Sequence, residues 1–304
     1  MPTYEQPAGP VIRDCPQGTL ARDLVILAET GADIPEIFIM QYDLHILPFH
    51  VSLGGVSMND GAFPTEDVFT CFDKTGQLPT TACISPVEYR EAFRGLHKMY
   101  PGKVVLHLCY SACTTSTWKS AVLGSEGLTG VVHFDTRQVS GGECAVVIAI
   151  AQFLEQHPTA TLAEVLAYAQ GVIVRSRFVF VPSTLDYLRA GGRVSRAAHF
   201  GGSLLGIKPP IETRDGYLIN EKKYRGSMES VCPRVLEDFL KANPVDKATL
   251  FLEYSPGLPE AIRKAVEQSL KKLGYTCNYW VKAGATISCH SGPGAFGLGG
   301  LLPA

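Results

Sequence analysis

Two glycine-containing runs bring together the residues of this chain most suited to binding an anion. A Gly-Gly-Arg-Val-Ser run occupies residues 191–195, and a His-Ser-Gly-Pro-Gly run occupies residues 290–294. Glycine adopts backbone angles that other residues resist. The Gly191-Gly192 pair therefore predicts a tight turn that holds Arg193 at the start of the next segment. A guanidinium held there suits a carboxylate or phosphate. The alternative is that the glycines only cap the preceding helix.

These runs, together with two hydroxyl-rich segments at residues 78–86 and 111–121, resemble the motifs of the DegV family of bacterial fatty-acid-binding proteins. The resemblance extends from about residue 24 onward and keeps the order of the family's motifs. It implies a two-domain α/β fold, with an N-terminal parallel sheet flanked by helices and a C-terminal mixed α+β domain. Family members bind one acyl chain between the domains and present its carboxylate to a separate fatty acid kinase, which forms an acyl phosphate.

The resemblance also implies a set of ligand-binding residues and no cofactor other than the bound fatty acid. Hydroxyls donate hydrogen bonds without adding charge, and they stand at the loop positions that usually hold the carboxylate. His290 would orient the headgroup, and Arg193 would neutralise it from behind or face the kinase. The predicted ligand-binding residues are Thr81, Thr115, Ser116, Thr117, Arg193 and His290. The alternatives are helix caps for the threonines and a buried, backbone-bonded role for the histidine.

Several positions depart from the family pattern. The family's Thr-Ser-Gln-Pro-Ser loop is Thr-Ala-Cys-Ile-Ser at residues 81–85, and Ser116 replaces a family glycine. Cys83, Cys113 and Cys289 fall in segments expected to converge on the headgroup. We interpret them as small packing residues, with a thiol cluster that binds zinc or senses oxidation as the alternative. Arg225 is a second basic candidate, and its alternative is a solvated surface charge.

Composition limits the class of protein. The net charge is −2 with dispersed basic residues, which argues against a nucleic-acid partner. No apolar run approaches the roughly 18–20 residues that span a bilayer, so we expect at most transient membrane contact. The nine cysteines show no framework spacing and indicate free thiols. We therefore expect a cytoplasmic bacterial protein.

The pattern of elements predicts where the domains lie. Residues 1–20 read as a flexible leader, 21–178 as the N-terminal α/β domain, and 179–304 as the C-terminal domain. Apolar strands are expected at 24–27, 46–51, 104–108, 131–135, 249–253, 277–281 and 285–288, with a hairpin turning at Asp215-Gly216. Helices are expected at 65–74, 86–99, 118–123, 142–157, 161–174, 235–243 and 258–273. The loops of Thr81, Thr115 and Asp135 should follow parallel strands, where ligands bind.

A long-chain acid needs a dry slot for its tail and donors for its carboxylate. Each buried methylene stabilises the complex by about 0.8 kcal/mol, so a chain of roughly fifteen contributes on the order of 12 kcal/mol before ordering costs. Two other functions stay open. One is an acyl-transfer or hydrolase enzyme that uses Ser, Thr or Cys with His in the same cleft. The other is a binder of another small acid.

Overall fold

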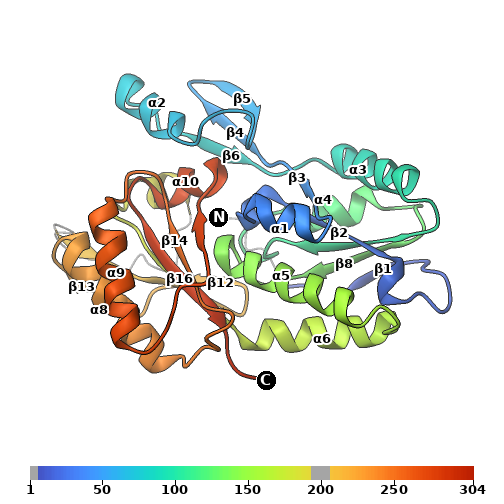
Figure 1. The fold of residues 1–304 in the computed structure, drawn as a ribbon. Helices are drawn as coiled ribbons and strands as arrows, with labels where there is room; N and C mark the ends of the chain where they lie inside the picture. Colours follow the sequence, from blue (N-terminus) through green and yellow to red (C-terminus); the bar gives the residue numbers. More distant parts are fainter. Residues whose placement is uncertain (1–5, 193–205) are drawn as a thin grey trace.

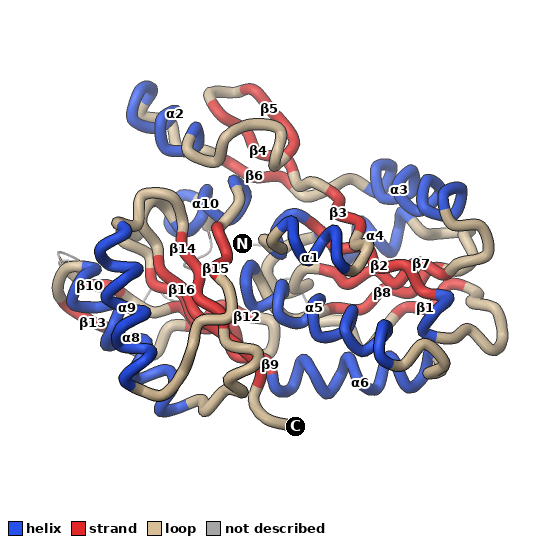
Figure 2. Tube along the Cα trace, in the orientation of Figure 1, coloured by secondary structure: helices blue, strands red, loops and turns tan. Residues whose placement is uncertain are grey.

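The computed structural model describes residues 6–192 and 206–304, and it contains two large sheets side by side (Figures 1 and 2). Arg193 lies outside the described residues. The sheets belong to the predicted N-terminal α/β domain and C-terminal mixed α+β domain, so the predicted fold class is confirmed.

The first sheet is mainly parallel and has the strand order β1-β8-β7-β2-β3. The inner strands are apolar runs that are buried on both faces, as expected for a parallel sheet covered by helices. The edge strand β1 pairs antiparallel with β8, so part of the predicted leader belongs to this sheet. Its strands are β1 (Val11–Arg13), β2 (Leu24–Glu29), β3 (His45–Leu47), β7 (Val104–Cys109) and β8 (Val131–Asp135).

The second sheet is mixed and has the strand order β12-β11-β9-β16-β14-β15. The predicted hairpin is β11 and β12, and its turn is at Asp215 and Gly216 as expected. The predicted domain boundary at 178/179 falls within β9. The strands are β9 (Ser176–Val181), β11 (Ile211–Arg214), β12 (Tyr217–Ile219), β14 (Phe251–Tyr254), β15 (Trp280–Lys282) and β16 (Phe296–Leu301), with β10 (Ile207–Lys208) and β13 (Tyr224–Arg225) forming a separate pair.

A small third sheet, β5-β4-β6, extends from the first domain above α10 of the second (Figure 1). The prediction of one strand over residues 46–51 was wrong, because Pro48 lacks an N–H and separates β3 from β4. Thr81 consequently lies in a short antiparallel strand rather than in a loop after a parallel one. The strands are β4 (His50–Leu53), β5 (Val56–Asn59) and β6 (Thr80–Ala82).

Helices cover both large sheets. The α8 and α9 helices pack on the outer side of the second sheet, and α5 lies between the two domains (Figure 1). The α8 helix starts at Met228 rather than at the predicted residue 235. Pro233 lies inside the helix, and the helix extends to its N-terminal side because Val231 and Cys232 there are buried in the hydrophobic core. The helices are α1 (Glu36–Gln41), α2 (Asp67–Thr75), α3 (Pro86–Met99), α4 (Thr117–Gly124), α5 (Ser140–Gln156), α6 (Leu162–Arg175), α7 (Asp186–Ala190), α8 (Met228–Ala242), α9 (Glu260–Lys272) and α10 (Ala285–Ser291).

The start of α3 follows directly from its sequence. The Ser85 hydroxyl accepts a hydrogen bond from the Glu88 backbone N–H at 3.3 Å, and the Glu88 carboxylate accepts one from the Ser85 N–H at 2.8 Å. This reciprocal capping satisfies two backbone donors that a helix start otherwise leaves unpaired. No helix among the described residues is long and apolar enough to cross a membrane.

The contact between α3 and α4 gives a test of the packing. A Cβ at Gly124 would lie 2.7 Å from the Pro86 carbonyl and 2.8 Å from the Tyr89 Cβ, whereas a Cβ at Gly171 in α6 meets nothing within 4 Å. We expect Gly124→Ala to destabilise the protein by about 1–3 kcal/mol through overpacking. Gly171→Ala should stabilise it by up to about 1 kcal/mol through helix propensity. Urea unfolding of both variants measures this, and equal effects would contradict the described helix contact.

Candidate functional site

A narrow cavity lies between the two domains. It contains about 860 Å³ of space not filled by protein atoms, part of it open to solvent. Its walls are largely apolar and come from both domains. Phe49, Tyr110 and Val139 belong to the first domain, and Phe178, Leu188 and Phe296 belong to the second. A narrow apolar slot between domains is a typical small-molecule site.

The short helix α10 positions His290 at one wall of this cavity. Two aspartates of the first domain accept hydrogen bonds from the first N–H groups of α10 and the residue before it. Asp33 accepts from Gly284 at 2.7 Å, and Asp60 accepts from Ala285 at 3.0 Å and from Thr286 at 3.1 Å. Carboxylates at this end stabilise a helix by satisfying orphan donors and by interacting with the helix dipole.

The prediction of a strand over residues 285–288 was wrong, because this segment belongs to α10. The residues that cap α10, Asp33 and Asp60, are far away in the sequence, so no local pattern indicates a helix start. His290 therefore lies in the last turn of a helix, followed by the Gly-Pro-Gly turn and by β16.

Thr81 and His290 meet in the cavity wall. The Thr81 Oγ1 lies 2.8 Å from the His290 Nε2, and both residues line the cavity. A Cβ at Gly191 would lie 2.2 Å from the His290 Nδ1, so the first glycine of the Gly-Gly pair leaves room for the imidazole. The pair also follows the end of α7, where the Gly191 N–H donates to the Tyr187 carbonyl. Gly191 therefore both ends α7 and leaves room for the His290 imidazole.

The second hydroxyl-rich segment contributes fewer cavity residues than predicted. Thr115 lines the cavity, and its hydroxyl lies 2.9 Å from the Thr117 hydroxyl. Thr117 is fully buried in α4, away from the cavity lining. Ser116 is also absent from the lining, and its hydroxyl lies 3.0 Å from the Cys83 Sγ. Thr115 also accepts the Thr117 N–H at 3.4 Å, which is the capping alternative.

Among the weaker candidates, Cys83 lines the cavity, whereas Arg225, Cys113 and Cys289 do not. Arg225 is exposed in β13 and does not line the cavity. The described structure does not gather the three predicted thiols into a metal-ligating group. Cys113 donates to the Asp215 carbonyl at 3.8 Å, and Cys289 packs in the core beside Tyr187. Burial raises the pKa of Cys289 to about 12, which makes a thiolate there unfavourable.

A carboxyl pair that no sequence pattern indicated lies beside the cavity, where Glu253 lines the wall and Asp33 lies behind it, outside the lining. The Ser140 Oγ lies 2.5 Å from the Asp33 Oδ2 and 2.6 Å from the Glu253 Oε1. Because a hydroxyl has one proton to donate, one of the two carboxyl groups must itself be protonated. Burial raises the pKa of Glu253 to about 7, and burial followed by the Glu253 charge raises the pKa of Asp33 well above its usual value. No spacing pattern links these residues, because the pair forms only when the domains meet.

The fold and the cavity define a two-domain α/β protein with a narrow apolar slot between its domains. The family model described as "Uncharacterised protein, DegV family" matches residues 23–301. The chain therefore belongs to the DegV family, as its motifs predicted.

Relatives and solved structures agree with this assignment. A DegV domain-containing protein of Caldanaerobacter subterraneus subsp. tengcongensis is 29% identical over 282 residues, covering 90% of this chain and 97% of the relative. A Thermotoga maritima protein named a fatty acid-binding protein is 26% identical, covering 90% and 96%.

Among solved structures, a DegV family protein from Thermus thermophilus described by its fatty acid binding has a TM-score of 0.82 at 24% identity, covering 92% of this chain and 99% of its own. A Thermotoga maritima structure described as revealing a fatty acid binding function has a TM-score of 0.75 at 26% identity, with the same coverage.

The carboxyl pair predicts a pH dependence. A carboxyl pKa that is raised in the folded state adds stability below the unfolded pKa near 4.5, and that stability is lost as the pH rises through about 7. We expect the free energy of unfolding to fall by up to about 3 kcal/mol between pH 5 and pH 8. Glu253→Gln should flatten this slope, while exposed Glu237→Gln should not. Identical slopes in chemical unfolding of all three proteins would contradict a protonated pair.

Proposed function

We propose that this protein binds one long-chain fatty acid in the cavity between its domains and presents the carboxylate to a separate fatty acid kinase. The observation that carries the proposal is the combination of a narrow apolar cavity with a hydroxyl–imidazole pair in its wall. The Thermotoga maritima relatives named for fatty acid binding support the same ligand class.

The tail is the main source of affinity in this proposal. Phe178, Leu188 and Phe296 are nearly or fully buried and contribute to an apolar wall. A slot lined mainly by apolar side chains suits a single unbranched chain, whose methylenes gain about 0.8 kcal/mol each on burial. The protonated form of the Asp33–Glu253 pair favours such a tail, because a neutral acid costs less than a charged one beside hydrocarbon.

The head is held by uncharged donors. The Thr81 hydroxyl donates to the carboxylate, and the His290 imidazole orients that hydroxyl across their 2.8 Å contact. Thr115 supplies a second hydroxyl from the opposite segment. Among the described residues these donors are neutral, and Arg193, which the motif predicts near the headgroup, lies outside them. A carboxylate oxygen attacks the γ-phosphorus of ATP, from which ADP leaves as the acyl phosphate forms.

One observation favours a second candidate function. A hydroxyl and an imidazole at hydrogen-bond distance also form a nucleophile and its general base, so Thr81 and His290 have the geometry for acyl transfer. Hydrolysis of a long-chain ester or thioester by the protein alone, abolished by both Thr81→Val and His290→Gln, would favour the enzyme over the carrier.

Removal of the Thr81 hydroxyl tests the headgroup assignment. Thr81→Val keeps the shape of the side chain, and Thr80→Val is the matched control, because neighbouring strand residues point to opposite faces. We expect Thr81→Val to weaken binding of palmitic acid about 10- to 100-fold, since a hydrogen bond to a charged group contributes about 1.5–3 kcal/mol. Equilibrium dialysis with radiolabelled palmitic acid measures this. Equal affinities in wild type and Thr81→Val would reject Thr81 as the donor.

Presentation to a kinase has its own test. With a purified bacterial fatty acid kinase and ATP, the palmitate-loaded protein should yield an acyl phosphate that hydroxylamine traps as a hydroxamate. We expect the yield to require the kinase, ATP and this protein together, and to fall in Thr81→Val at a palmitate concentration that saturates the variant. Trapping that is equally efficient with free palmitate and no DegV protein would contradict presentation.

A further inference from the structure

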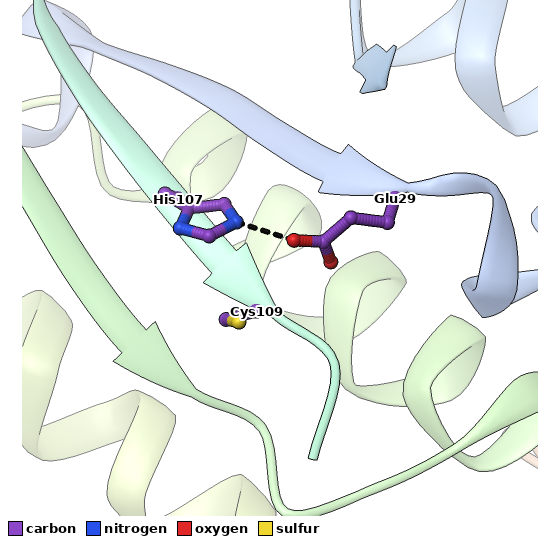
Figure 3. Close-up of side chains that lie close together, drawn as sticks. All are labelled: Glu29, His107 and Cys109. Atoms are coloured by element: carbon purple, nitrogen blue, oxygen red, sulfur yellow. Dashed lines mark hydrogen bonds and ion pairs between the residues drawn. The ribbon is translucent and has the colours of Figure 1, made fainter. Parts of the chain in front are cut away.

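One buried polar group of the first domain satisfies its own hydrogen bonds. Figure 3 shows Glu29 facing His107 from the neighbouring strand, with Cys109 beside them. The Ser125 hydroxyl donates to the His133 Nε2 at 2.8 Å, and the His133 Nδ1 donates to the His107 Nδ1 at 2.9 Å. The His107 Nε2 then donates to the Glu29 Oε1 at 2.6 Å. Each neutral imidazole has one N–H and one acceptor nitrogen, so this group needs no ligand.

Thr286 in the wall of the interdomain cavity lacks such a partner. The residue is 7% exposed, and its hydroxyl makes no hydrogen bond with the described residues. The hydroxyl of every other described serine and threonine in the cavity lining has a partner. These residues are Thr81, Thr114, Thr115, Ser140, Ser255 and Ser291. Because an unpaired buried hydroxyl is unfavourable, a bound molecule that supplies a partner gains affinity there.

Thr286 lies on the face of α10 that lines the cavity. The lining residues in and just before this helix are spaced three and four apart, which marks one helix face. They are Ala283, Thr286, Ile287, His290 and Ser291. Thr286 is therefore one turn before His290, or about 6 Å along the helix axis. Threonine in a helix divides between two rotamers, so rotation about one bond exchanges its methyl and hydroxyl groups at the cavity wall.

Acidic residues surround the end of α10 that carries Thr286. Asp60 accepts the Thr286 N–H at 3.1 Å, and Asp33 accepts the N–H of the residue before the helix at 2.7 Å. Asp33 is in turn linked to Glu253 in the cavity wall. A further negative charge beside these groups is unfavourable. The ligand's carboxylate therefore belongs at the His290 end, and Thr286 suits a neutral oxygen.

We propose that Thr286 forms a second polar subsite, which binds a neutral oxygen on the acyl chain, so that the preferred ligand is a hydroxylated fatty acid. This inference rests on the proposed function, in which Thr81 and His290 hold the carboxylate. A plain methylene chain leaves the Thr286 hydroxyl unpaired, whereas a chain hydroxyl can both donate to it and accept from it. The separation of about 6 Å along α10 corresponds to about five bonds of an extended chain.

Competition binding tests the subsite. Palmitic acids with a single hydroxyl group at successive carbons, from the carboxyl end to the middle of the chain, compete with radiolabelled palmitic acid in equilibrium dialysis. We expect at least one of them to bind wild type about 3- to 10-fold more tightly than palmitic acid. Thr286→Val removes the hydroxyl with little change in shape and should abolish this preference. Thr286→Ser retains a hydroxyl and should keep it.

The matched control is Thr213→Val. Thr213 is 8% exposed, its hydroxyl also lacks a partner among the described residues, and it does not line the cavity. Both valine variants remove an unpaired buried hydroxyl, so both should raise the urea midpoint of the ligand-free protein. Only Thr286→Val should change the preference between hydroxylated and plain acids.

Two results would overturn the inference and leave the proposed function standing. One is wild type that binds palmitic acid but prefers none of the hydroxylated acids, and the other is a preference that persists in Thr286→Val. Failure of wild type to bind any of these acids would reject the proposed function and the inference together. Urea unfolding confirms that each variant folds, and Thr286→Ala removes the same hydroxyl if Thr286→Val does not fold.

Discussion

The burial of several carboxyl groups without a buried lysine or arginine constrains the whole described structure. The buried acids are Glu29, Asp33, Asp60, Asp135, Glu143 and Glu253, and no lysine or arginine is buried with them among the described residues. An isolated buried carboxylate is very unfavourable, so each group needs a proton, backbone donors or a cation. The way in which each carboxyl group is satisfied determines how the domains join and where the site lies.

Where the two domains meet, Asp33 and Glu253 share a proton, and Asp33 and Asp60 cap a helix. Asp33 and Ser140 adopt left-handed backbone angles, with φ of 50° and 48°, and Ser140 lies within hydrogen-bond distance of both Asp33 and Glu253. Such strain persists only where the surroundings enforce it. Asp33 and Asp60 then cap α10, which holds His290 against Thr81. The interactions that join the domains are therefore those that place the candidate headgroup residues.

Local patterns predicted most of the fold, because its parallel strands are continuous apolar runs and α3 carries its own capping residues. They failed where the deciding partner is distant. The caps of α10 come from Asp33 and Asp60, and Pro48 divides residues 46–51 between two sheets. Motifs identified Thr81, Thr115 and His290, which line the cavity. They gave no indication of Glu253 or of the Glu29–His107–Cys109 group, since these side chains meet only in the folded chain.

The proposed function depends on the slot between the domains holding one fatty acid. Native mass spectrometry of the freshly purified protein tests it most directly, because the intact complex and its released ligand are weighed in one experiment. We expect one long-chain fatty acid per chain, or uptake of one added palmitic acid by ligand-free protein. A ligand of another chemical class in the slot, or ligand-free protein that takes up no palmitic acid, would contradict it.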